Sequence, residues 1–139
     1  MRLQSTSANC GPASLSNALA AVGVVRTEAE CEALCATTGT DGTSARGLLK
    51  AVRAVGREPI VIDERRALVA YLRLEAALRV GRAVVLCVDA MSHWVAAVGL
   101  LGARVLVADP ADNELVTSVT PDALEARWSH NGRRYGVEV

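Results

Sequence analysis

The chain has 139 residues, just over half of them apolar, and its 15 basic and 15 acidic residues cancel to a net charge of zero. This length and composition predict one folded domain over residues 1–139 and exclude a disordered chain. The balanced charge gives no electrostatic case for binding nucleic acid or an anionic membrane.

The expected helices lie mainly in the first half of the chain and the expected strands mainly in the second half. Hydrophobic periodicity predicts helices in the first half, with Thr27 opening a capping box and Ser44 capping the next helix. Runs rich in β-branched residues, divided by Gly or Asp, predict strands in the second half. In chain order we expect helices at 10–22, 27–35 and 44–56, a strand at 59–62, a helix at 65–80, strands at 83–88, 94–101, 104–108 and 115–119, a helix at 120–128 and a strand at 135–139.

This order predicts an α+β fold, with N-terminal helices packed on a mainly antiparallel sheet. Both sets of alternate side chains are apolar in the strand that follows His93. We therefore expect that strand to be buried on both faces.

The compartment and the metal content follow from the apolar runs and the cysteines. No apolar run is long enough to cross a bilayer, and the segment before Cys10 is too polar for a signal peptide. We expect a cytoplasmic protein with reduced thiols and no membrane insertion.

Cys31 and Cys35 share a helix face, but zinc would need two further ligands, so we expect core packing for both and for Cys87. No metal or cofactor is predicted.

Cys10 is the candidate nucleophile. It is followed by Gly11-Pro12 and an apolar helical stripe, and Pro12 suits the first turn of a helix. Cys10 is therefore predicted at a helix N-terminus, where free N–H groups and the helix dipole lower the pKa of a thiol. The alternative is a buried structural cysteine, which is the more common role of a lone cysteine.

Two distant residues favour the catalytic interpretation. His93 opens one predicted strand and Asp109 ends the next, so two adjacent antiparallel strands bring a carboxylate beside an imidazole. A nucleophile, a base and an orienting acid are thus expected together. Asp89 and Asp112 are alternatives to Asp109 as the acid.

These residues resemble the bacteriocin-processing, double-glycine leader peptidases, which are papain-like cysteine peptidases. The resemblance rests on Gln4, Cys10-Gly11-Pro12, Gly42-Thr43-Ser44, His93-Trp94-Val95 and Ala108-Asp109-Pro110, with their order and spacings. It implies a papain-like fold in which Cys10, His93 and Asp109 are catalytic and Gln4 helps to form the oxyanion hole. It also implies cleavage after a Gly-Gly pair, through a narrow cleft, and association with a peptide exporter.

The substrate-binding candidates are Gly42, Thr43, Ser44 and Trp94. For Gly42 to Ser44 the alternative role is to start a helix, and for Trp94 it is core packing. The substrate is expected to be a peptide or protein, and the sequence leaves the oligomeric state open.

The sequence leaves the acyl acceptor open as well. The run Cys-Gly-Pro-Ala-Ser-Leu also resembles phytochelatin synthase and transglutaminase-like relatives. An acyltransferase or a deamidase with the same triad, and a non-catalytic peptide-binding module, therefore remain alternatives to a peptidase.

Overall fold

The computed structural model describes all 139 residues and contains five helices and six strands. The helices are α1 (Cys10–Ala21), α2 (Glu28–Cys35), α3 (Ala45–Ala54), α4 (Ala67–Arg79) and α5 (Pro121–Trp128). The strands are β1 (Ile60–Glu64), β2 (Val84–Val88), β3 (His93–Leu101), β4 (Arg104–Ala108), β5 (Val116–Val119) and β6 (Arg134–Glu138). The predicted elements are all present, with ends that differ by a few residues. For example, β1 continues past Ile62 to Glu64, and α3 ends at Ala54 rather than at Gly56.

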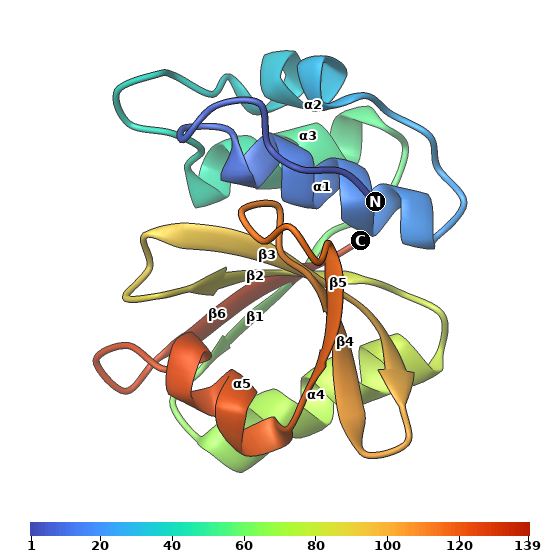
Figure 1. Cartoon of the computed structure of the whole chain (residues 1–139), viewed down its shortest axis with the longest axis vertical. Coiled ribbons are helices and arrows are strands. Elements are labelled where there is room, and N and C mark those ends of the chain that lie inside the picture. Colours follow the sequence, from blue (N-terminus) through green and yellow to red (C-terminus); the bar gives the residue numbers. More distant parts are fainter.

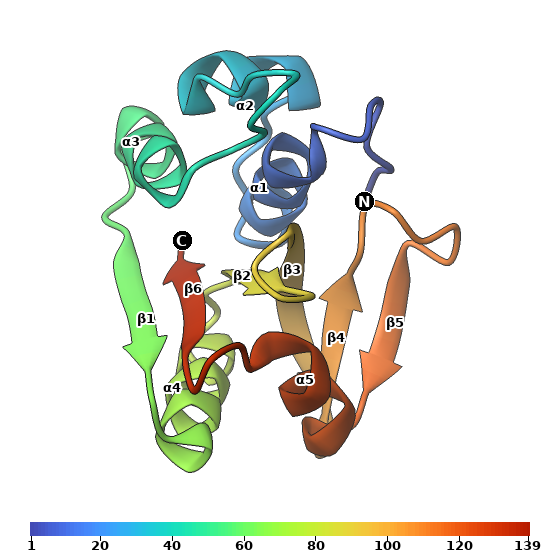
Figure 2. The ribbon, with the colours of Figure 1, turned by 90° about the vertical axis from the view of Figure 1, so that its left-hand side faces the viewer.

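The strands form one sheet in the order β1-β6-β2-β3-β4-β5, and every neighbouring pair is antiparallel. Figure 2 shows the sheet as a strongly curved surface with β1 and β5 at its edges. Val88 of β2 lies opposite His93 of β3, and Ala96 of β3 lies opposite Ala108 of β4. The start of β3 and the end of β4 therefore lie at the same end of the sheet.

Helices cover both faces of the sheet (Figure 1). One buried cluster joins α1, α2 and α3 to the strands, and a second joins α4 and α5 to the opposite face. Along β3, Trp94 and Ala96 belong to the first cluster, whereas Val95 and Ala97 belong to the second. This confirms the prediction that the strand is buried on both sides.

Local sequence signals place the helix starts. Thr27 and Glu30 form the predicted capping box, and the side chains of Ser44 and Thr120 each accept a hydrogen bond from a backbone N–H in the first turn of their helix. Cys31 and Cys35 are buried in the core beneath α2, as predicted. None of the five helices combines the length and the hydrophobicity that a membrane crossing requires.

Helices α2 and α3 approach closely at Gly47. A Cβ added at Gly47 would lie 2.2 Å from the backbone carbonyl oxygen of Cys35, which belongs to α2. Because backbone cannot move aside as a flexible side chain does, this position requires glycine.

We predict that Gly47→Ala destabilises the protein by about 1–3 kcal/mol, because the methyl group overpacks the α2–α3 contact. Helix propensity alone would favour alanine by about 1 kcal/mol, so the two effects have opposite signs. Thermal and denaturant unfolding measure the difference. Gly39→Ala is the matched control, since a Cβ there meets nothing within 4 Å; equal stabilities of the two variants would contradict the close contact.

Candidate active site

Cys10 is the first residue of α1, and only 8% of its surface is exposed. Asn9 precedes the helix but does not cap it, because its side-chain amide donates to Glu28 and Glu32 of α2 instead. The N–H groups at the start of α1 therefore keep their capacity to stabilise an anion. The thiol lies where the sequence predicts it, at a helix N-terminus.

His93 and Asp109 meet at the end of the sheet. Continuing the β3–β4 register past Ala96 and Ala108 places Asp109 opposite Val95, on the same face as His93. The two side chains are in contact, with His93 Nε2 at 2.7 Å from Asp109 Oδ1. Since Nε2 is engaged with the carboxylate, Nδ1 is the ring nitrogen left for the Cys10 thiol.

The three groups shift one another's pKa. Burial raises the pKa of the Cys10 thiol, but hydrogen bonds from His93 and from the backbone N–H groups of Trp94 and Gly11 outweigh it, so the pKa is lowered. The hydrogen bond to Cys10, opposed by burial and supported by Asp109, raises the pKa of His93 to about 9. The arrangement favours a thiolate beside an imidazolium.

The other cysteines have the opposite electrostatics. Burial raises the pKa of Cys31 and Cys87 to about 11 and that of Cys35 to about 12. All four cysteines are free thiols. Only Cys10 therefore has the properties of a nucleophile near neutral pH.

The two alternative acids have other partners. The carboxylate of Asp89 is bound by the guanidinium of Arg127, at 2.9 and 2.7 Å. Asp112 accepts the backbone N–H of Glu114 within its own loop. Asp109 is the carboxylate that contacts the imidazole of His93.

The backbone of Gln4 lies next to the segment that follows Asp109, but the side-chain amide of Gln4 is not directed at the Cys10 thiol. Its backbone N–H donates to the carbonyl of Pro110 at 2.9 Å, which ties the N-terminal segment to the end of β4. Its side-chain Nε2 donates to the carbonyl of Thr6, while Oε1 is buried without a partner. The amide would have to rotate before it could donate to a substrate at Cys10.

The loop of residues 38–44 is fastened against the start of α1. The indole N–H of Trp94 donates to the carbonyl of Thr43 at 3.1 Å, and the Thr43 hydroxyl lies 2.6 Å from that of Thr37. A Cβ on Gly11 would lie 2.4 Å from the Thr43 hydroxyl, so glycine after Cys10 permits this close packing. Trp94 is 7% exposed and serves mainly as packing, whereas the Ser44 side chain caps α3.

A cavity of about 300 Å³ opens beside Cys10. Most of its walls are short side chains: Ser7, Ala8, Cys10, Gly39, Thr40, Asp41, Gly42, Thr43, Met91, Ser92 and Trp94. The structure thus brings Gly42, Thr43 and Trp94 to the thiol, while Ser44 lies outside this lining. Sequence reasoning missed seven lining residues, which are near the predicted residues in sequence and carry no distinctive signal of their own: Ser7, Ala8, Gly39, Thr40, Asp41, Met91 and Ser92.

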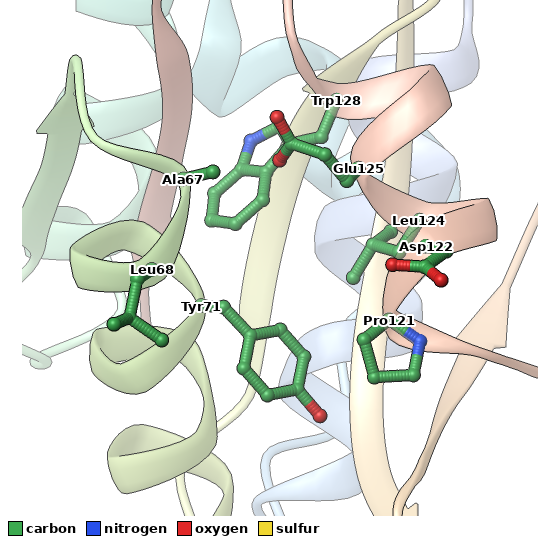
Figure 3. A pocket seen from close by; sticks show the side chains of 8 residues that line it. All are labelled: Ala67, Leu68, Tyr71, Pro121, Asp122, Leu124, Glu125 and Trp128. Carbon is green, nitrogen blue, oxygen red and sulfur yellow. The ribbon is translucent and has the colours of Figure 1, made fainter.

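A second hollow, of about 260 Å³, lies between α4 and α5 (Figure 3). Tyr71, Pro121, Leu124 and Trp128 give it a largely apolar lining. Its lining contains no cysteine or histidine.

Arg127 is a further residue at the site that sequence reasoning missed. It extends from α5 and its Nη2 lies 3.1 Å from Asp109 Oδ2. An arginine on a short amphipathic helix gives no sequence signal, because most such residues face solvent.

Solved structures share this fold. The peptidase domain of Streptococcus ComA, a bi-functional ABC transporter, is 21% identical at a TM-score of 0.76, with 98% of this chain and 93% of that chain covered. A double glycine motif protease from an AMS/PCAT transporter, in complex with its leader peptide, is 20% identical at 0.70, covering 98% and 88%. A putative C39-like peptidase from Bacillus anthracis is 12% identical at 0.69, covering 100% and 94%. At these identities the likeness establishes the fold, which is the predicted one.

The family follows from the sequence. No curated protein matches the chain. The model of the peptidase C39 family, however, matches residues 1–132, which is nearly the whole chain. The chain therefore belongs to the peptidase C39 family and is a cysteine peptidase.

Proposed function

We propose that the chain hydrolyses peptide bonds with Cys10 as nucleophile, His93 as base and acid, and Asp109 as the orienting carboxylate. The observation that carries this proposal is the 2.7 Å contact between His93 Nε2 and Asp109, together with a Cys10 thiol whose pKa is lowered and a His93 whose pKa is raised by their mutual interaction. A cavity beside the thiol gives a substrate access to it.

The reaction runs in two acyl transfers. The Cys10 thiolate attacks the peptide carbonyl carbon and forms an S–C bond. As the C–N bond breaks, the His93 imidazolium protonates the leaving amine. His93 then takes a proton from water, and the hydroxide adds to the thioester carbonyl. Loss of sulfur from that carbon frees the carboxylic acid and restores the thiolate–imidazolium pair.

The developing oxyanion needs donors in a fixed position. The backbone N–H of Cys10 lies at the start of α1, where the helix N-terminus carries a partial positive charge. We propose the Gln4 amide as the second donor, after its Nε2 leaves the Thr6 carbonyl. The buried Gln4 Oε1 has no partner to hold the amide in its present orientation.

We propose that the substrate is a peptide with glycine at the cleavage site, as in leader-peptide processing. Small residues form most of the cavity wall, and a Cβ on Gly42 would lie 3.7 Å from the carbonyl of Ala8 across it. A channel of this kind accepts extended backbone and excludes branched side chains. The double glycine motif protease has been solved with a leader peptide bound. A peptide exporter is accordingly the proposed partner, and the reducing cytoplasm the proposed compartment for four free thiols.

We predict that the chain cleaves a synthetic leader peptide after its Gly-Gly pair and that Cys10→Ala abolishes this turnover, because no other thiol is activated. Mass spectrometry of the products locates the cleaved bond, and an acyl-enzyme adduct on Cys10 reports the thioester. Replacing the second glycine of the peptide with valine is expected to prevent cleavage.

The matched control is Cys31→Ala, which removes a fully buried cysteine with a raised pKa and should retain activity. Turnover that survives Cys10→Ala would refute the proposed nucleophile. Products joined to an added amine, or released ammonia without chain cleavage, would instead identify an acyltransferase or a deamidase.

We predict that activity falls as the pH rises through about 9, where the His93 imidazolium loses its proton. Asp109→Asn removes the anion that stabilises the imidazolium, so the pKa of His93 falls and the alkaline limb moves to lower pH. A wrongly held imidazole also lowers kcat, by up to about 10⁴. The measurement is the pH profile of kcat/KM.

Asp112→Asn is the control for this variant, because Asp112 lies in the same loop and its side chain bonds only to the backbone N–H of Glu114. An alkaline limb that is the same in Asp109→Asn and in the wild type would argue against Asp109 as the partner of His93.

A further inference from the structure

Arg127 links the two segments that carry the histidine and the acid. Its guanidinium binds Asp89 through two parallel hydrogen bonds, Nε to Oδ1 and Nη2 to Oδ2, and the same Nη2 reaches Asp109 Oδ2 at 3.1 Å. Its backbone carbonyl also accepts the N–H of Asp89 at 2.9 Å. Through this one residue, helix α5 is therefore bound to both Asp89 and Asp109.

The contact with Asp109 fixes how that carboxylate is oriented. Oδ1 accepts from His93 Nε2 and from the backbone N–H of Ala111, whereas Oδ2 accepts from Arg127. Each oxygen therefore has its own donors, and rotation of the carboxylate would break bonds on both sides. The side chain of Asp109 is only 13% exposed, so solvent does not replace these donors easily.

The contact with Asp89 holds the turn that precedes His93. Three successive non-glycine residues of this turn, Asp89, Ala90 and Met91, have φ values of 53°, 58° and 61°, which L-residues seldom adopt. Such a turn persists only where surrounding contacts maintain it. The fork from Arg127 and the Asp89 N–H bond supply contacts at its first residue.

Charge explains why the arginine needs a second carboxylate. Alone, the guanidinium would compete with the His93 imidazolium for Asp109 and would repel that imidazolium. Asp89 neutralises the guanidinium, so the negative charge of Asp109 remains available to stabilise the His93 imidazolium. The groups around His93 are then Cys10 from α1, Asp109 beyond β4, Asp89 from the β2–β3 turn, and Arg127 from α5 behind the two carboxylates.

We propose that Arg127 is a positioning residue for the peptidase reaction, which orients the Asp109 carboxylate toward His93 while Asp89 neutralises its charge. This inference rests on the proposed triad. It goes beyond it by assigning two further residues and by giving α5 a part in the active site.

The chain contains a matched ion pair for comparison. Arg133 binds Asp63 through the same two-bond fork, Nε to Oδ1 at 3.1 Å and Nη2 to Oδ2 at 2.7 Å. The carboxylate side chains of Asp63 and Asp89 are equally exposed, at 41%. Of the two arginines, only Arg127 also contacts Asp109. Variants of the Arg133–Asp63 pair therefore show the effect of losing an ion pair alone, without an effect on the site.

The first test needs no substrate. We expect Asp89→Asn to lower the pKa of His93, because a negative charge is lost and the guanidinium turns fully to Asp109. Asparagine tolerates the left-handed conformation of this position, and the bond from its backbone N–H to the Arg127 carbonyl is unaffected, so the turn is retained. NMR titration of the histidine ring protons measures this pKa, with His130→Gln assigning the two signals. Asp63→Asn should leave it unchanged; an unchanged pKa in Asp89→Asn as well would overturn the role of Asp89.

The second test is a double-mutant cycle with the Gly-Gly peptide. Arg127→Met should lower kcat by roughly tenfold with little change in KM, since the acid loses its orientation. In an Asp109→Asn background the same change should cost less than about twofold, because the residue through which it acts is already lost. Arg127→Lys, which keeps the charge without the fork, should recover part of kcat, and Arg133→Met should retain all of it.

The outcomes separate this inference from the proposed function. If Arg127→Met costs the same factor in both backgrounds, or costs nothing, the positioning role is wrong even though Cys10→Ala is inactive. If Cys10→Ala keeps its turnover, the triad itself fails. Thermal unfolding of each variant identifies a general loss of stability. If Arg127→Met is destabilised in this way, the kcat of Arg127→Lys is used instead to test the positioning role.

Discussion

The site depends on one imidazole that contacts an acid and is electrostatically coupled to a thiol. His93 Nε2 lies 2.7 Å from Asp109, and its ring interacts with Cys10, so that each group favours the charged form of the next. Burial opposes the ionisation of all three, and the mutual contacts outweigh it. An activated thiol in this fold therefore requires that three separate segments end at the same place.

The architecture meets that requirement by covering a curved sheet on both faces. Helices α1 to α3 pack on one face of the sheet (Figure 1), and the N-terminus of α1 lies at the start of β3. The antiparallel β3–β4 pair places Asp109 beside His93, and α5 on the other face contacts Asp109 and Asp89 through Arg127. The N-terminal segment joins the same end of the sheet through the bond from Gln4 to Pro110. Each layer thus contributes a group at one end of the sheet.

Residue patterns were sufficient for the elements and for the pairing of histidine and acid. Alternation along β3 predicted a strand buried on both faces, and adjacent antiparallel strands predicted Asp109 beside His93. The side-chain geometry could not be obtained in this way. Arg127 looks like a surface residue of a short helix, and nothing in its sequence context indicates two carboxylates from distant loops. Likewise, the resemblance gives Gln4 a role, but the orientation of its amide depends on the local fold of residues 4–6.

The most direct test of the coupled pair is the ultraviolet absorbance of the Cys10 thiolate as a function of pH, with the Cys10→Ala variant as the blank. If His93 stabilises the thiolate, the wild type will show thiolate absorbance at neutral pH, and His93→Gln will move the titration to clearly higher pH. The other cysteines, whose pKa values are raised by burial, will contribute only at alkaline pH. Identical titrations in the wild type and in His93→Gln would contradict the central claim that one histidine activates Cys10.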